Sequence, residues 1–206
     1  MKSVAIVAGG EKPKRIPKAD FFIGVDRGAL WLLRQGIVPD IAVGDFDSVT
    51  NPEKKFIHDR TKKYIEFPQE KDETDLELAI DEAIRLKPNE VCIYGALGKR
   101  FDHGLTAIGM LLKLESHNIY GEIVDNFNKI NIVRHQFTLT KDKKYPYVSI
   151  IPLDASAIVS LKGFMYNVSK KIFSQYSSLG ISNEIPGKSA TIFVHQGKAL
   201  VILSRD

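Results

Sequence analysis

Hydrophobic residues in the first two-thirds of the chain alternate between short continuous runs and helical spacing. Runs of four to six mostly apolar residues, typical of buried strands, occur at 3–8, 21–25, 41–44, 64–67, 91–94 and 120–124. A helix is expected over 27–35, another from near Asp102 to about His117, and a third directly after Asp72. The third helix has an apolar stripe at i, i+3, i+4, i+7 and i+8, formed by Leu76, Ala79, Ile80, Ala83 and Ile84. Alternating strands and helices predict an α/β domain with a mainly parallel sheet.

From about Lys129 the pattern changes to short strands with no helices between them. The expected strands are 130–134, 137–140, 147–151, 158–164, 171–173, 190–195 and 199–203. Gln196-Gly197 is typical of a hairpin turn between the last two. The sequence therefore predicts an all-β sandwich after the α/β domain, with domains at 1–135 and 136–206 and a boundary near His135.

The composition indicates a soluble globular protein. The chain has 206 residues, 44% of them hydrophobic, which is enough for one sizeable core or two small ones. No apolar stretch approaches the ~20 residues that cross a bilayer, and Met1 runs almost directly into a predicted strand, so we expect neither a membrane partner nor a signal peptide. The single Cys92 lies in an apolar run and suits a packed thiol in a reducing cytoplasm.

The positive charge of the chain does not indicate a nucleic-acid partner. The formal net charge is +4, but the lysines and arginines are scattered over several loops. A nucleic-acid surface usually concentrates its basic residues on one motif, often with stacking aromatic side chains. Solvated surface charge is the better interpretation, and mild basicity also suits a polyphosphate substrate.

Three polar clusters each follow a predicted strand, at residues 44–48, 72–75 and 98–103. Because the carboxyl ends of the strands share one edge of an α/β sheet, clusters far apart in sequence can converge there. Asp45 and Asp47 are two residues apart in a loop and can direct both carboxylates at one hard cation. Mg²⁺ prefers a few carboxylates together with phosphates and water, so the clusters predict a metal–phosphate site.

Each cluster also has a purely structural interpretation. Asp72 could be the N-cap of the following helix, with Asp75 favourable in its first turn. Arg100 and Asp102 could form a surface ion pair, or Asp102 could cap its helix. Asp45 and Asp47 would repel each other unless solvent or a cation lies between them. Beside a phosphate, Arg100 would offer paired hydrogen bonds and a permanent charge.

The common phosphate-binding loops are absent from the sequence. Gly187-Lys188-Ser189 has the ending of a P-loop, but Ser182 stands where the motif requires glycine, and the surrounding pattern is β. No GxGxxG fingerprint occurs either. A bound nucleotide would therefore be held by Mg²⁺, basic side chains and helix N-termini.

Six motifs, in this order, resemble those of the thiamin pyrophosphokinase family, and together they extend over nearly the whole chain. They are GVDRGA (24–29), PD (39–40), GDFDS (44–48), KDETDLE (71–77), GALGKRFDH (95–103) and SSLGISNE (177–184). The resemblance implies an enzyme that transfers the pyrophosphoryl group of ATP to the hydroxyl of thiamin in one reaction, giving thiamin diphosphate and AMP.

The resemblance also implies an architecture. It points to a homodimer in which an N-terminal α/β domain binds nucleotide and metal and a C-terminal β-sandwich binds thiamin and forms the dimer. Each active site would lie between the α/β domain of one subunit and the sandwich of the other. Ser182 and Asn183 would contact thiamin from the partner subunit.

Further residue roles follow from matching the motifs. Asp45, Asp47 and Asp75 would hold Mg²⁺, with Asp72 close by. The nucleotide would be bound by a second group: Asp26, Lys71, Thr74, Arg100 and Asp102.

Three points stay open at this stage. Arg27 stands where relatives often have glycine, and it could contact a phosphate or merely reach solvent. Phe173 or Tyr176 could stack on thiamin, although aromatic residues in a sandwich are more often core. A Mg²⁺-dependent phosphohydrolase and a non-catalytic ligand-binding protein are the alternative functions, since both could use the same acidic residues.

Overall fold

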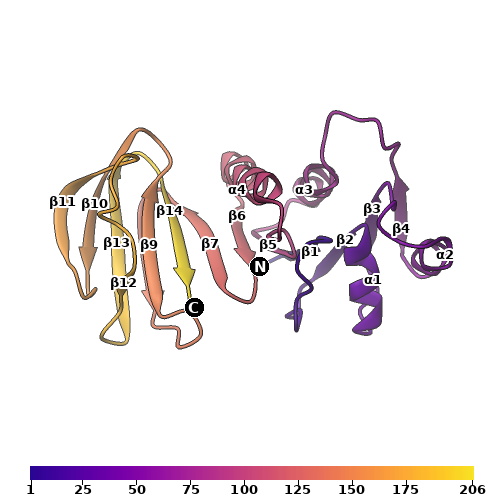
Figure 1. The fold of residues 1–206 in the computed structure, drawn as a ribbon, viewed down its shortest axis with the longest axis horizontal. Helices are drawn as coiled ribbons and strands as arrows, with labels where there is room; N and C mark the ends of the chain where they lie inside the picture. Colours follow the sequence, from indigo (N-terminus) through magenta and orange to yellow (C-terminus); the bar gives the residue numbers. More distant parts are fainter. The chain divides into compact units, whose positions relative to one another are not determined.

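A computed structural model describes all residues, 1–206, and they form two compact units, Met1–Asn126 and Phe127–Asp206 (Figure 1). The division precedes strand β7 (Asn128–Val133), whereas the sequence pattern suggested a boundary near His135. β7 belongs to the second unit because it pairs antiparallel with β14 (Ala199–Ser204).

The first unit contains a parallel sheet with the strand order β6-β5-β1-β2-β3-β4. In chain order the strands are β1 (Ser3–Val7), β2 (Phe21–Val25), β3 (Ile41–Gly44), β4 (Lys63–Glu66), β5 (Glu90–Tyr94) and β6 (Tyr120–Val124). The predicted parallel α/β sheet is confirmed. Its order places the ends of β2 and β3 next to each other, and these ends carry the site.

Four helices connect the strands: α1 (Arg27–Arg34), α2 (Asn51–His58), α3 (Asp75–Arg85) and α4 (Phe101–Ser116). The α3 stripe is buried at Ala79, Ile80 and Ala83, as its spacing predicts. α1 contributes Trp31 and Leu32 to a core cluster against which Cys92 packs. None of the helices is both long enough and apolar enough to span a membrane.

Helix α2 was not expected from the apolar pattern, because only Ile57 in it is buried. Its signal lies in its first turn. Thr50 and Glu53 form a capping box in which the Glu53 carboxylate accepts a hydrogen bond from the Thr50 amide at 3.0 Å, and Pro52 lies in the first turn. These are local signs of a helix start, independent of amphipathicity.

The second unit is a sandwich of antiparallel strands, as predicted. One layer has the order β12-β9-β14-β7 and the other β11-β10-β13-β8. The remaining strands are β8 (Gln136–Thr140), β9 (Tyr147–Pro152), β10 (Ser156–Lys162), β11 (Val168–Ser174), β12 (Asn183–Glu184) and β13 (Ser189–Gln196). The core between the layers joins Val148, Ile150 and Val201 to Val159 and Ile192.

The expected hairpin at Gln196-Gly197 is wrong. β13 and β14 lie in different layers and do not pair with each other. Gly197, at φ 79°, turns the chain from one layer to the other. A turn motif indicates that the chain reverses direction, but not which strand the following strand will pair with.

Candidate functional site

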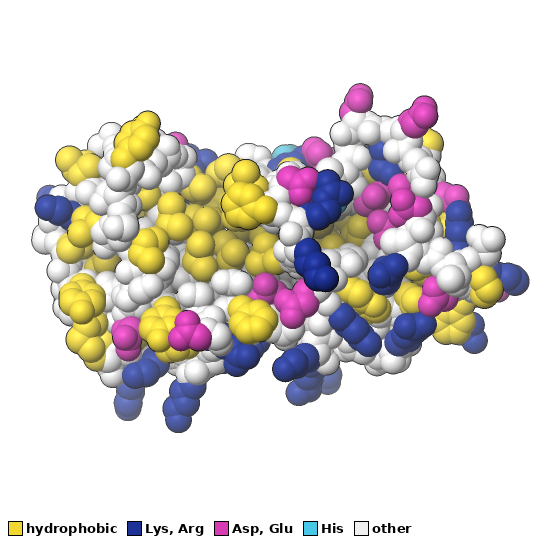
Figure 2. All heavy atoms as spheres, viewed as in Figure 1, with side chains coloured by type: hydrophobic (Ala, Val, Ile, Leu, Met, Phe, Trp, Pro, Cys, Tyr) yellow, Lys and Arg dark blue, Asp and Glu magenta, His cyan; other side chains and the backbone are white.

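Three carboxylates converge at the carboxyl edge of the parallel sheet. Asp26 follows β2, Asp45 follows β3 and Asp75 opens α3, and one carboxylate oxygen from each lies within 4.8 Å of the others. Figure 2 shows acidic side chains gathered on this unit with Lys and Arg side chains around them. The structure thus brings Asp45 and Asp75 together, and it adds Asp26.

Asp26 reaches this cluster because its backbone is in an unusual conformation, with φ 47° and ψ −120°. Its Oδ1 accepts a hydrogen bond from the Phe46 amide at 3.0 Å. Gly44 makes room for the contact, because a Cβ atom at that position would lie 1.9 Å from Asp26 Oδ1. Strained backbone of this kind persists where the surrounding structure over-determines it and is concentrated at functional sites.

The cluster carries more negative charge than the protein neutralises. Partial burial, followed by the charge of Asp75, raises the pKa of Asp26 to about 7, although the Phe46 amide opposes the shift. The pKa of Asp47 is also raised, by desolvation and then by the neighbouring Asp45 charge. Both shifts mean that ionisation is disfavoured here unless a cation is close.

Lys71 is the one basic side chain paired with this cluster. Its Nζ lies 2.9 Å from Asp75 Oδ1 and 3.7 Å from Asp45 Oδ2, and it donates a hydrogen bond to the Pro68 carbonyl at 3.1 Å. Burial alone would lower the pKa of Lys71, but Asp75 and the other nearby carboxylates outweigh burial and raise it. A single ammonium group therefore faces three carboxylates.

The donor set fits a hard divalent cation. Asp75 Oδ1 is buried, and its contact with Lys71 is an ion pair without the geometry of a hydrogen bond, so the oxygen has no hydrogen-bond partner. A buried carboxylate oxygen that lies among other carboxylates, with one ammonium group beside it, suits a cation that prefers oxygen ligands.

Two other predicted residues lie near the cluster without belonging to it. Asp47 is exposed, and its Oδ2 lies 3.4 Å from the Gln69 amide nitrogen. Asp72 is exposed in the loop before α3. The suggestion that Asp72 caps α3 is wrong, because Thr74 is the N-cap and its hydroxyl accepts a hydrogen bond from the Glu77 amide at 3.2 Å.

Arg100 and Asp102 form the surface ion pair that was one of the two interpretations of their spacing. Arg100 Nη2 lies 2.6 Å from Asp102 Oδ2, and both side chains are exposed. Arg100 stands at the N-cap position of α4 and Asp102 in its first turn, so Asp102 does not cap the helix. An exposed pair contributes little to stability, so either group can change partner at small cost.

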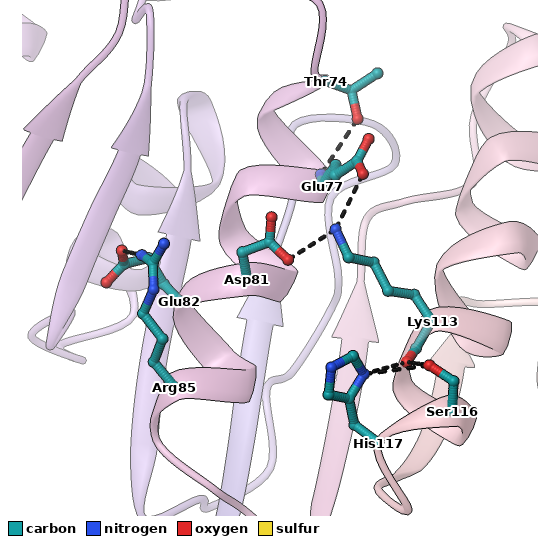
Figure 3. Close-up of polar contacts among 8 residues, drawn as sticks. All are labelled: Thr74, Glu77, Asp81, Glu82, Arg85, Lys113, Ser116 and His117. Carbon is teal, nitrogen blue, oxygen red and sulfur yellow. Dashed lines mark hydrogen bonds and ion pairs between the residues drawn. The ribbon is translucent and has the colours of Figure 1, made fainter.

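Helices α3 and α4 are joined by the ammonium group of one lysine (Figure 3). Lys113 extends from α4 to α3, where its Nζ lies 3.0 Å from Glu77 Oε1 and 2.7 Å from Asp81 Oδ1. α3 begins at Asp75, and α4 begins directly after Arg100. This bridge therefore links two helices whose N-terminal ends carry predicted site residues.

In the second unit, the side chain of Asn183 is turned into the fold. Asn183 is 5% exposed, and its side chain is hydrogen-bonded within the chain. Its Oδ1 accepts from the amides of Tyr166 at 3.1 Å and Glu184 at 2.9 Å, while its Nδ2 donates to the Tyr166 carbonyl at 2.8 Å. Asn183 thus holds the turn between β10 and β11. Its neighbour Ser182 is exposed, at φ 55°.

The turn held by Asn183 presents an aromatic residue that the sequence did not single out. Tyr166 is 71% exposed although its backbone is fixed on both sides by Asn183. Phe173 is 2% exposed and belongs to the core, so it is not available for stacking, whereas Tyr176 is 96% exposed. No local pattern distinguishes Tyr166, because its partner lies 17 residues away.

Comparison with known proteins identifies relatives for both units. Residues 13–122 match the model of the thiamin pyrophosphokinase catalytic domain, and residues 134–199 match the thiamin pyrophosphokinase vitamin B1 binding domain. The thiamine pyrophosphokinase of Bacillus subtilis (strain 168) is 36% identical over 214 residues, which cover 100% of both chains.

Solved structures agree with these matches. The crystal structure of thiamine pyrophosphokinase from Bacillus subtilis superposes with a TM-score of 0.91 at 34% identity, and that of a thiamin pyrophosphokinase family protein from Enterococcus faecalis with 0.91 at 30%, each covering 100% of both chains. Thiamin pyrophosphokinase from Candida albicans, at 16% identity, shares the fold with a TM-score of 0.85 over 100% of this chain and 89% of its own. With both units matched and full-length relatives above 30% identity, this chain belongs to the thiamin pyrophosphokinase family.

Proposed function

We propose that this protein transfers the pyrophosphoryl group of ATP to the hydroxyl of thiamin, producing thiamin diphosphate and AMP. The observation that carries the proposal is the convergence of three carboxylates beside Lys71, at the sheet edge of a chain whose two units match the two domains of the family. The comparisons give no support to the alternative of a nucleotide or sugar-phosphate phosphohydrolase.

Magnesium would be held by Asp26, Asp45 and Asp75, with Asp47 completing the set from the exposed end of its loop. The buried oxygen of Asp75, which is ion-paired with Lys71 and lies among the other carboxylates, supports this assignment. When bound, Mg²⁺ neutralises charge on the phosphates and orients them. Lys71 balances part of the carboxylate charge and would donate to a phosphate oxygen bound at the same edge.

The residues around the cation position the reactants. Phosphoryl transfer depends mainly on placement and on stabilising charge at the transferring group, and no covalent intermediate with the protein is required. Arg100, released from its exposed pair with Asp102, would hold a phosphate, and Asp102 would contact the nucleotide. Thr74 fixes the first turn of α3, which directs backbone amides toward the same edge, and Asp72 lies in the loop before it.

Thiamin would bind to the second unit through Tyr166 and Ser182. Thiamin is a cation with an aromatic pyrimidine ring, so an exposed aromatic side chain on a fixed backbone suits it. Asn183 would act through the turn that carries Tyr166. This revises the direct contact that the motif suggested for Asn183.

The active form would be a cytoplasmic homodimer with shared sites. The acidic residues lie in the first unit and Tyr166 and Ser182 in the second, and the family resemblance implies that the two halves of a site come from different subunits. The first unit would bind nucleotide and metal, and the second thiamin and the partner subunit.

Product analysis tests the reaction. The protein is incubated with Mg²⁺-ATP and thiamin, and we expect equal amounts of AMP and thiamin diphosphate. Formation of ADP and thiamin monophosphate would reject pyrophosphoryl transfer. Release of phosphate in the absence of thiamin would favour a phosphohydrolase, and binding without turnover would favour a non-catalytic protein.

A further inference from the structure

Arg27 contacts the metal-binding loop from outside the acidic cluster. It is the first residue of α1, and its Nε donates a hydrogen bond to the Ser48 carbonyl at 3.0 Å. The Nη2 group of Arg27 donates to the same carbonyl. Two donors of one guanidinium therefore fix a single backbone oxygen that lies 21 residues away in sequence.

Together with its neighbour, Arg27 holds the loop at two points. Asp26 accepts a hydrogen bond from the Phe46 amide, and Arg27 donates one to the Ser48 carbonyl. Two consecutive residues of the β2–α1 junction therefore bind alternate residues of the loop. Asp47 lies between these two anchors. The first anchor is reinforced by the Phe46 ring, which is buried and stacks on Tyr64 with ring centroids 4.6 Å apart.

The second anchor has little other support. The Ser48 hydroxyl is buried without a hydrogen-bond partner, so the serine side chain does not fix this end of the loop. The next backbone contact, from the Val49 amide to the Phe46 carbonyl, is long at 3.4 Å. Regular structure resumes only at the Thr50–Glu53 capping box of α2.

The loop also contains like charges that push it apart. The Asp47 amide donates a hydrogen bond to Asp45 Oδ1 at 3.1 Å, so the two carboxylates lie close in one short loop and repel each other when both are ionised. A fixed Ser48 carbonyl limits how far Asp47 can move away from Asp45. Holding metal ligands in place before the metal arrives is what preorganisation requires.

We propose that Arg27 is a positioning residue that holds the loop of residues 45–48 in its metal-binding conformation through the Ser48 carbonyl. This inference rests on the proposed function, because that function assigns Asp45 and Asp47 to the cation. It contrasts with a direct phosphate contact, in which the charge of Arg27 would matter and its hydrogen bond to Ser48 would not.

Two neutral variants separate the hydrogen bond from the charge. In Arg27→Gln, the amide nitrogen takes the chain position of Arg Nε and keeps one donor for the Ser48 carbonyl. Arg27→Met has a similar length and no donor. Both remove the positive charge, so any difference between them reports the hydrogen bond. Arg34→Met is the charge-loss control on the same helix, because Arg34 is paired with Glu53 of α2 and not with a residue of the 45–48 loop.

The first measurement is the affinity for Mn²⁺ alone, from the free-ion electron paramagnetic resonance signal, with thermal melting as a check of folding. Loss of a nearby positive charge should by itself tighten cation binding. We nevertheless expect Arg27→Met to bind Mn²⁺ more weakly than Arg27→Gln, by up to about tenfold, since Met lacks the neutral amide hydrogen bond that Gln keeps. Arg34→Met should match the wild type.

The second measurement is steady-state kinetics. If Arg27 positions the loop, the Met variant should need more Mg²⁺, and saturating Mg²⁺ should restore most of kcat with the KM for ATP unchanged. Equal Mn²⁺ affinity in the Gln and Met variants would overturn the proposal. So would an equal rise in the KM for ATP in both variants at saturating Mg²⁺, which would indicate a phosphate contact. Because the Mn²⁺ experiment contains no substrate, it stands even if the proposed reaction fails.

Discussion

Two polar regions of the molecule differ in how completely the chain pairs their hydrogen-bonding groups and charges. One is the acidic edge of the first unit, and the other surrounds Asn183 in the second unit. Asp26, Asp45 and Asp75 converge with one ammonium group between them, and Asp75 keeps a buried oxygen without a hydrogen bond. Asn183 also belongs to one of the family motifs, but its side-chain oxygen and nitrogen both form hydrogen bonds with the Tyr166 backbone.

The contrast indicates which motif residues act on ligands and which support them. A polar group whose capacity for hydrogen bonds is unused in the folded chain is available to a ligand, at some cost to stability. A polar group that is fully bonded inside the chain stabilises the fold. The two regions should therefore respond oppositely when their polar side chains are removed.

The largest effect is expected for Asp45→Asn. The change keeps the volume and an acceptor for the Asp47 amide, but it removes one of the converging charges. Turnover should fall by about 10³-fold, as for the loss of a major electrostatic contact in an active site, while the melting temperature stays equal or rises. Mg²⁺ should raise the melting temperature of the wild type and not that of the variant. Unfolding of the variant at ordinary temperature would assign Asp45 a structural role.

Asn183→Ala should show the reverse behaviour. It leaves the Tyr166 amide, the Tyr166 carbonyl and the Glu184 amide without partners, so we expect the free energy of unfolding to fall by about 2–4 kcal/mol in chemical denaturation.

Tyr166→Ala is the matched control in the same turn. Its exposed side chain can be removed with little loss of stability, yet kcat/KM for thiamin should fall by about tenfold. A stable Asn183→Ala protein with a selective thiamin defect would mean that Asn183 contacts thiamin directly.

Mixing two impaired variants, assayed at thiamin concentrations well below KM, tests whether the two regions meet across subunits. Asp47→Asn and Tyr166→Ala carry lesions in different units, so a heterodimer would have one site free of both. Random exchange of equal amounts makes about half of the dimers mixed, each with one intact site of two, so the gain should approach about a quarter of wild-type activity. No gain after exchange has been verified by mass spectrometry would place both halves of a site in one subunit.

The smallest effect is expected from the bridge between α3 and α4. Lys113→Met leaves Glu77 and Asp81 facing each other, which should lower the free energy of unfolding by about 1 kcal/mol and reduce kcat less than threefold. The control is Lys55→Met, whose more exposed pair with Asp59 should contribute less to the free energy of unfolding. A larger loss of kcat would show that the helix spacing matters more to the site than we infer.

Much of the architecture follows from sequence periodicity, because burial of apolar faces fixes both strands and helices. The parallel sheet, the sandwich and the α3 stripe are of this kind. Helix α2 has almost no buried face, so its capping box is the main sign of it in the sequence. The pairing of β13 and β14 with other strands depends on contacts far along the chain, which a turn signal does not contain.

The site is less predictable because it also depends on contacts between residues far apart in the sequence. Asp26 joins the carboxylates only because its backbone adopts φ 47° and folds its side chain toward the loop after β3. Arg27 donates to a backbone carbonyl, a group that every residue has, so the sequence does not show which residue accepts the bond. Long-range hydrogen bonds of this type decide the roles of motif residues without leaving a local pattern.

The central claim is that one reaction moves two phosphorus atoms together from ATP to thiamin at the carboxylate cluster. The most direct test uses ATP labelled with ³²P at the β-phosphorus, with Mg²⁺, thiamin and wild-type protein. We predict labelled thiamin diphosphate in an amount equal to the AMP formed, and almost none with Asp45→Asn. Unlabelled thiamin diphosphate accompanied by ADP would mean two successive γ-phosphoryl transfers and would contradict the account.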